Sequence, residues 1–285
     1  MKELQNKYEI KNIHTDYMDL LNDDIDIVYV AVPNHLHYQF AKQAIEKKKH
    51  VLLEKPFASS TAQAKELINL AKEHNVILFE AISNQYLPNY SKVKELIKDL
   101  GDIKIVQLNY SQYSRRYDLF KEGTVLPVFD VEQSGGALMD LNVYNIHFIV
   151  GLFGKPDAIA YIANIERGID TSGILTLDYP NFKCVAIGAK DCKSPVSINI
   201  QGDKGYIHSD DPANVFQQFV FGENLGNETE YQLNNNKNRL YYEVAYFARL
   251  VTEENYKIAE ELNQHTISVM EILDAGREQV GIKVC

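Results

Sequence analysis

The sequence predicts an α/β protein built from an incomplete, doubly wound parallel sheet followed by an α+β region with a large, mostly antiparallel open sheet. Three observations support this prediction. Residues 25–99 alternate short apolar runs with amphipathic helical patterns, as βαβ units do. Residues 103–208 contain a series of strand-like runs with few long helices between them. No glycine-rich turn precedes the first apolar run, so the parallel sheet is expected to lack its opening unit.

The first half opens with the run IDIVYVAVP, whose β-branched residues favour a parallel strand covered on both faces. Two further apolar runs predict the next strands of the same sheet. Amphipathic patterns between and after them predict helices. We therefore place a partial nucleotide-binding domain at 1–100 and a second domain at 101–285. The expected strands are 25–33, 50–54 and 76–81, and the expected helices are 38–48, 61–74 and 88–99.

The second half is expected to form the antiparallel sheet. A helical apolar stripe interrupts the strands at 135–153, and two closing helices are expected at 238–253 and 266–281. The chain between Tyr110 and Phe120 reads as a loop leaving the first strand. The expected strands are 103–112, 159–166, 174–178, 183–189, 196–200 and 206–208.

Composition excludes several classes of protein. The formal net charge of -10 argues against a nucleic-acid surface, which needs a basic patch. No apolar run reaches the roughly 20 residues of a membrane helix, and the charged first residues do not resemble a secretory signal. Cys184, Cys192 and Cys285 are odd in number and form no metal-like motif. We therefore expect a cytoplasmic protein with no membrane, nucleic-acid or metal partner.

The segment HVLLEKPF places a lysine directly after an apolar strand. Pro56 fixes its own φ and favours an extended conformation at Lys55, so the strand ends there and holds the ammonium at its carboxyl end. Ligands bind at this end of the strands in open α/β sheets. The alternative is a surface lysine paired with Glu54.

Other polar residues are weaker candidates. Asn34 and His37 follow the first strand, where they either contact a ligand or form a turn and helix cap. Asp140, Tyr144 and His147 are spaced by four and three residues, which brings all three near one face of a helix. Tyr144 alone could equally be a core aromatic residue.

Arg116, in the sequence SRRYD, is a candidate ligand for a carboxylate or phosphate group of a substrate. Paired arginines in a solvated loop are the alternative.

Four segments together resemble the Gfo/Idh/MocA family of NAD(P)-dependent oxidoreductases, in particular its dihydrodiol-dehydrogenase-like and sugar-dehydrogenase-like members. The segments are AVPNHLH at 31–37, HVLLEKPF at 50–57, GGALMDLNVYNIH at 135–147 and VMEILDAGREQVGI at 269–282. The resemblance covers essentially the whole chain. It implies a Rossmann domain followed by an open-sheet domain that binds substrate on one face and commonly mediates association on the other, as a homodimer or homotetramer.

The resemblance also implies roles for individual residues. NAD or NADP is expected to contact Pro33, Asn34, His37, Glu54 and Lys55. The implied catalytic residues are Lys55, Asp140 and Tyr144, and the implied substrate contacts are these three together with His147. The implied reaction is reversible hydride transfer between NAD(P) and a secondary alcohol or carbonyl of a sugar, inositol or trans-diol.

Such a reaction requires a group that accepts the hydroxyl proton in one direction and returns it in the other. Lys55 and Tyr144 are both candidates. Either side chain ordinarily titrates near 10, so we expect desolvation or a nearby positive charge to lower the pKa of the lysine.

The opening of the chain departs from the family pattern. Members begin with a strand, a G-x-G-x-x-G turn and a helix, whereas residues 4–16 resemble the end of the second helix. We expect roughly forty to fifty residues of the usual domain to be missing and dinucleotide binding to be weak. The alternative function is a non-catalytic sugar-binding or assembly protein derived from this family.

Overall fold

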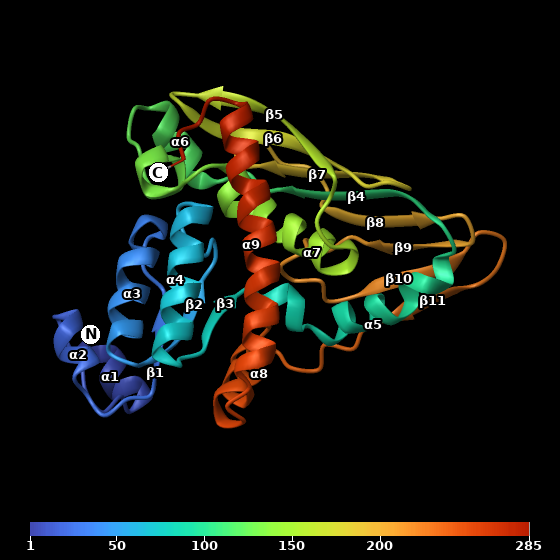
Figure 1. Cartoon of the computed structure of the whole chain (residues 1–285). Coiled ribbons are helices and arrows are strands. Elements are labelled where there is room, and N and C mark those ends of the chain that lie inside the picture. Colours follow the sequence, from blue (N-terminus) through green and yellow to red (C-terminus); the bar gives the residue numbers. More distant parts are fainter. Residues whose placement is uncertain (285) are drawn as a thin grey trace.

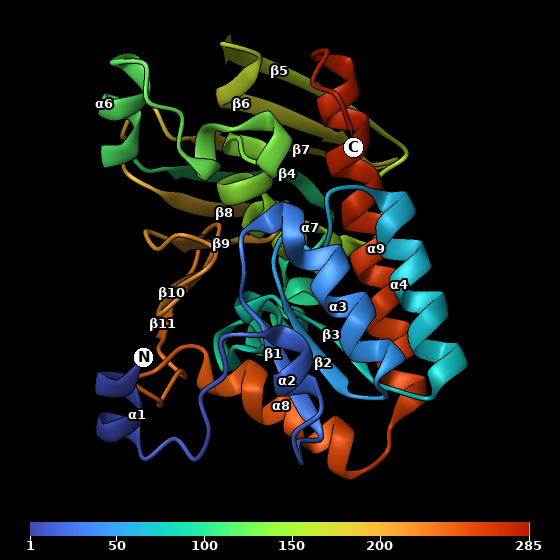
Figure 2. The same cartoon turned by 90° about the vertical axis from the view of Figure 1, so that its left-hand side faces the viewer.

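A computed structural model describes residues 1–284 and shows two sheets joined by long helices (Figure 1). Cys285, one of the three cysteines considered above, lies outside these residues. A three-stranded sheet lies in the first hundred residues, and an eight-stranded sheet follows. The long helix α9 (Tyr256–Gln279) runs between the small sheet with its helices and the large sheet (Figures 1 and 2). The predicted fold class is confirmed.

The small sheet is parallel, with the strand order β1-β2-β3. Its strands are β1 (Ile27–Val30), β2 (His50–Glu54) and β3 (Leu78–Ala81). Helices α3 (His37–Glu46) and α4 (Thr61–His74) connect the strands and lie along one side of the sheet (Figure 2). The predicted bounds of β2 and α4 are confirmed. Before β1 come α1 (Lys2–Tyr8), which buries none of its residues, and α2 (Tyr17–Leu21).

The expectation that β1 is covered on both faces is wrong. Val28 and Val30 are buried, but Ile27 is 38% exposed and Tyr29 is 48% exposed. The reason is the position of α8 (Tyr241–Thr252), whose Phe247 packs with residues of β2 and β3. That apolar cluster contains no described residue of β1. One face of the edge strand therefore remains in contact with solvent.

The large sheet has the order β11-β10-β9-β8-β4-β7-β6-β5, and only the β4–β7 pair is parallel. Sequence analysis missed the hairpin β10–β11 at its edge. The hairpin is short and β11 is almost wholly exposed, so its sequence lacks a buried apolar pattern. The strands are β4 (Ile103–Ser111), β5 (Ala158–Glu166), β6 (Ile169–Asp178), β7 (Lys183–Ala189), β8 (Ser197–Gly202), β9 (Gly205–Ser209), β10 (Phe219–Glu223) and β11 (Glu228–Tyr231).

The helical segment against the large sheet begins later than predicted. Gly135 and Gly136 precede it, a π-helical turn occupies Leu138–Asn142, and α7 (Val143–Phe153) continues from that turn. The surrounding stretch Val131–Phe153 is long and apolar enough to cross a membrane, but 72% of its most apolar window is buried inside the fold. It therefore has the burial of a core helix.

Three further helices differ from or refine the predictions. Where a loop was expected, Arg115–Lys121 forms the short helix α6, because the Ser114 hydroxyl accepts a hydrogen bond from the Arg116 amide. The last helix starts at Tyr256 rather than 266, because the Asn255 side chain caps it. Helix α5 spans Pro88–Leu96.

Helix α9 fixes the two sheets relative to each other. At the small sheet, Asp274 accepts a hydrogen bond from the Thr61 amide at 2.7 Å, and Arg277 donates to the carbonyl of Ser59 at 2.6 Å. At the large sheet, Gln279 accepts from the amide of Tyr161 at 2.8 Å. The loop after β2 is thereby held against the large sheet, and this contact positions the site described next.

Candidate functional site

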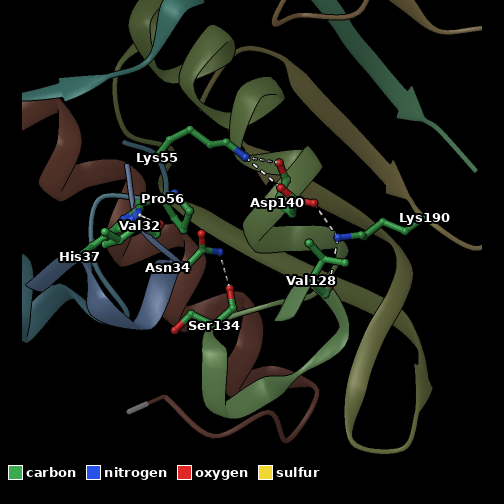
Figure 3. Close-up of polar contacts among 9 residues, drawn as sticks. All are labelled: Val32, Asn34, His37, Lys55, Pro56, Val128, Ser134, Asp140 and Lys190. Atoms are coloured by element: carbon green, nitrogen blue, oxygen red, sulfur yellow. Dashed lines mark hydrogen bonds and ion pairs between the residues drawn. The ribbon is translucent and has the colours of Figure 1, made fainter. Parts of the chain in front are cut away.

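Lys55 and Asp140 join the two sheets at the carboxyl end of β2. Lys55 follows the last residue of that strand, and Asp140 lies in the π-helical turn before α7. The lysine Nζ donates to the Asp140 carbonyl at 2.8 Å and to its Oδ1 at 3.0 Å (Figure 3). Lys55 is thus paired with a residue of the second half of the chain rather than with Glu54.

A second lysine, which sequence analysis did not select, binds the other side of the same carboxylate. Lys190 follows β7, and its Nζ donates to Asp140 Oδ2 at 2.6 Å and to the Val128 carbonyl at 3.0 Å (Figure 3). The side chain is 2% exposed. The available signal was the same one that identified Lys55, a lysine directly after an apolar strand, here in the sequence CVAIGAK.

Tyr144 lies beside Lys55. Its ring centroid is 4.8 Å from Lys55 Nζ and 6.2 Å from the ring of Tyr110 on β4. Its hydroxyl makes no hydrogen bond within residues 1–284, although the residue is largely buried. This hydroxyl is therefore not engaged by another described residue.

The charges keep both Asp140 and Lys55 ionised. Burial opposes ionisation of Asp140, but the two lysine ammonium groups outweigh it and hold the pKa of this carboxyl far below its ordinary value. Burial also opposes the charged form of Lys55, but Asp140 and then Tyr144 raise the pKa of this lysine. The expected lowering is therefore absent, and Lys55 carries a proton at neutral pH. The pKa of Lys190 is lowered, because burial outweighs its attraction to Asp140.

Asn34 and Pro33 line a cavity of about 350 Å³ next to Asp140. The Asn34 side chain donates to the carbonyl of Ser134 at 3.0 Å, which ties the loop after β1 to the segment before the π-helical turn (Figure 3). Arg116 lines the same cavity, and its guanidinium is exposed.

His37 is buried and braces the ends of two strands. One ring nitrogen lies 2.9 Å from the carbonyl of Val32 and the other 2.8 Å from that of Pro56, after a cis Lys55–Pro56 peptide bond (Figure 3). Burial lowers the pKa of His37 although both carbonyls favour its protonated form. Both nitrogens are thus occupied by protein atoms.

Glu54 points to the neighbouring strand. Its carboxylate accepts a hydrogen bond from the hydroxyl of Tyr29 on β1.

His147 belongs to a different cluster. It is fully buried, with Nδ1 2.9 Å from His265 Nε2 and Nε2 3.3 Å from Glu80 Oε1. Seven helical residues after Asp140 correspond to about 10 Å along the helix axis. His147 and Asp140 therefore lie on a similar face of the helix but at different heights along it. His147 does not reach Lys55 and Lys190, the two lysines that contact Asp140.

A larger cavity of about 860 Å³ is lined by Tyr110, whose ring is near Tyr144. Its lining includes the cations of Lys193 and Arg239 together with hydroxyl and amide side chains. This combination suits a hydroxylated ligand. Among its lining residues are Tyr110, Ser111, Lys193, Asp210, Asn214 and Arg239.

Family models match most of the chain. A model described as an oxidoreductase family with an NAD-binding Rossmann fold matches residues 1–82, and one described as the GFO/IDH/MocA C-terminal domain matches residues 90–208. The chain is 34% identical to scyllo-inositol 2-dehydrogenase (NADP(+)) IolU from Bacillus subtilis, over 98% of this chain and 86% of that protein. It is 28% identical to trans-1,2-dihydrobenzene-1,2-diol dehydrogenase from Xenopus tropicalis, over 72% of this chain and 62% of that protein.

Solved structures share the fold at lower identity. A 3-ketoreductase from Actinomadura kijaniata in complex with NADP and TDP-benzene superposes with a TM-score of 0.82 at 21% identity, covering 98% of this chain and 85% of that one. A levoglucosan dehydrogenase in complex with NADH and levoglucosan gives a TM-score of 0.80 at 17% identity, with coverage of 98% and 84%. The two-sheet arrangement is therefore shared with structures that contain a nicotinamide cofactor.

Proposed function

Because this chain belongs to the Gfo/Idh/MocA family of NAD(P)-dependent oxidoreductases, we propose that it transfers hydride reversibly between NAD(P) and a secondary alcohol or carbonyl of a sugar, inositol or trans-diol. The relatives named for scyllo-inositol and for a dihydrodiol support this class of substrate. The observation that carries the proposal is the Lys55–Asp140 ion pair beside the free Tyr144 hydroxyl, at the carboxyl end of a parallel strand.

Lys55 is proposed to act on the substrate oxygen. An ammonium has three N–H groups, and two of those of Lys55 are directed to Asp140. The third is free to donate to a hydroxyl or carbonyl oxygen. Because the pKa of Lys55 is raised, this side chain is charged before a substrate binds and is proposed to donate a proton to the oxygen of a carbonyl undergoing reduction. In the oxidation direction the resulting neutral amine would take the proton back from the hydroxyl group. The Tyr144 hydroxyl is placed to orient the same oxygen.

The residues fit the reacting end of a nicotinamide cofactor. Pro33 and Asn34 line the cavity beside Asp140 and would hold that end of the cofactor. His37 contacts the Val32 carbonyl and so fixes the loop after β1 that carries both residues. The cofactor, when bound, supplies or accepts the hydride.

A turnover assay tests the proposal. The purified 285-residue chain is incubated with NAD⁺ or NADP⁺ and with scyllo-inositol, D-xylose or a trans-dihydrodiol, and the absorbance of the reduced nicotinamide is followed. We expect turnover with one of these alcohols. Saturable cofactor binding with no turnover on any of them would contradict the proposed substrate class.

The second candidate function is sugar binding without redox chemistry. The cavity of about 860 Å³ favours it, because the charged, hydroxyl and amide side chains that line it suit a hydroxylated ligand without a cofactor. Fluorescence titration with NADH and NADPH separates the two candidates. Tight, saturable binding removes the second, whereas sugar binding without cofactor binding supports it.

We also propose that the outer face of the large sheet joins two copies of the chain. Three isoleucines from adjacent or nearby strands are exposed on it, with Ile162 at 74%. The other two are Ile105 and Ile174. An Ile162→Glu variant is expected to shift the protein towards monomer in light scattering, whereas an unchanged mass argues against this face. We place such an assembly in the cytoplasm.

A further inference from the structure

Each oxygen of the Asp140 carboxylate accepts a hydrogen bond from a different lysine. Its Oδ1 accepts from Lys55 and its Oδ2 from Lys190. Within residues 1–284, Oδ2 makes no other hydrogen bond. Rotation of the carboxyl group would break the shorter contact, of 2.6 Å, and would leave a buried ammonium without its partner.

The two lysines differ in what they can reach. Lys190 is 2% exposed, its Nζ is bonded to Val128 as well as to Asp140, and it lies 5.0 Å from the centroid of the Phe129 ring. Its backbone amide is also fixed, by the Thr171 carbonyl at 2.8 Å. Lys55 is 13% exposed and lies against Tyr144, whose hydroxyl is free. Lys55 is therefore accessible to a substrate, whereas Lys190 is enclosed by protein.

We propose that Lys190 is a positioning residue for the reaction, which holds Asp140 by Oδ2 so that Oδ1 and the backbone carbonyl direct the Lys55 ammonium at the substrate oxygen. This inference rests on the proposed function. Lys190 contacts neither substrate nor cofactor; it acts through Asp140. Its permanent contact orients the carboxylate before a ligand arrives, and such preorganisation favours the geometry needed for proton transfer.

The test uses two substitutions in the full chain. Lys190→Met removes both the charge and the hydrogen bonds, and Lys190→Gln retains a neutral donor. Lys65→Met is the matched control, because Lys65 is an exposed lysine that is also paired with a carboxylate, that of Glu271. We expect kcat to fall about 10- to 100-fold in Lys190→Met, with the KM for the cofactor unchanged. The Gln variant should retain more activity, and the control should behave as wild type.

A second readout does not depend on turnover. The carboxyl carbon of Asp140 is assigned by nuclear magnetic resonance through an Asp140→Asn variant and is followed during acid titration. In Lys190→Met and Lys190→Gln we expect its titration midpoint to rise by about one pH unit or more relative to wild type. The midpoint reports whether Lys190 contacts Asp140 in solution, and the fall in kcat at unchanged KM for the cofactor reports whether that contact serves the reaction.

The outcomes separate the inference from the proposed function. A raised midpoint with reduced kcat supports the inference. An unchanged midpoint in both folded variants overturns the inference. If the wild type turns over, an unchanged kcat in Lys190→Met overturns it as well. If the wild type has no turnover, the proposed function fails. In that case a raised midpoint still shows that Lys190 fixes Asp140, whereas the catalytic part of the inference is overturned.

Discussion

Asp140, in the π-helical turn before α7, and Asp170, which binds the first amide of that turn, are two carboxyl groups with opposite surroundings. Asp170 is buried, whereas Asp140 is 27% exposed. Asp140 contacts two lysine ammonium groups at 3.0 and 2.6 Å. Within residues 1–284, Asp170 on β6 accepts from neutral side-chain and amide donors, the Tyr161 hydroxyl and the Leu138 amide, both at 2.7 Å. Its Oδ1 has no hydrogen-bond partner within residues 1–284.

The difference shows that burial alone does not decide the charge of a carboxyl group. Burial raises the pKa of Asp170 to about 6, and its neutral donors and the more distant Lys190 do not compensate. At Asp140 two cations in direct contact reverse the effect. Asp170 therefore serves the fold, since it binds the amide of Leu138 at the start of the π-helical turn. Asp140 is suited to chemistry that needs a permanent charge.

Replacing Lys55 is expected to have the largest effect on turnover, because it removes one of the two cations that contact Asp140. Lys55→Met should reduce turnover by about 10²- to 10⁴-fold, because the proposed proton donor is lost. The fold should remain, since Asp140 keeps Lys190. Steady-state kinetics and circular dichroism measure the two properties. Lys65→Met, at an exposed lysine paired with Glu271, is the control. Near-normal turnover in Lys55→Met would remove Lys55 from the proposed catalytic residues.

Replacing Asp140 tests the contribution of the ion pairs to stability. Asp140→Asn leaves two lysines without a carboxylate, and one of them is 2% exposed. We expect the free energy of unfolding at pH 7 to fall by about 3–5 kcal/mol, as measured by urea denaturation. A loss below about 1 kcal/mol, typical of surface ion pairs, would show that the two ion pairs of Asp140 stabilise the fold no more than surface pairs do.

Replacing Asp170 tests the carboxyl group that has no cation in contact with it among the described residues. Because the folded pKa is raised to about 6, the folded state binds more protons than the unfolded state between about pH 4 and 6. Wild type therefore loses stability from this group as the pH rises through that window, by about 2–3 kcal/mol.

Asn cannot ionise, so the stability of Asp170→Asn relative to wild type should improve from pH 4 to pH 7. Urea denaturation at a series of pH values measures this difference. A difference that is flat with pH would mean that Asp170 does not titrate in this range.

The smallest effect on turnover is expected at Glu80. This carboxylate accepts from Thr266 at 2.7 Å and contacts His147, but it is not bonded to the lysine pair. Glu80→Gln should cost about 1–2 kcal/mol of stability and leave kcat within about threefold of wild type. A large loss of kcat at unchanged stability would bring His147 back into the proposed site.

Local patterns were sufficient for much of the fold and for part of the site. Strand β2 and helix α4 have the predicted bounds, because a continuous apolar run and an amphipathic repeat each depend on neighbouring residues alone. Lys55 was selected for the same reason, since the proline and the end of the strand are adjacent to it. The choice of Asp140 and Tyr144 as site residues depended on the family resemblance.

Only the tertiary structure decided which residues meet. Lys190 is 135 positions after Lys55, and no local pattern indicates that both bind one carboxylate. The sequence alone also left open whether His147 faces the same contacts as Asp140, because helical spacing describes direction around the axis and not position along it. The sequence determined most of the strands and helices and the lysine that follows β2. Packing of the two sheets through α9 determined the charge network around that lysine, because contacts between distant segments depend on how the elements pack.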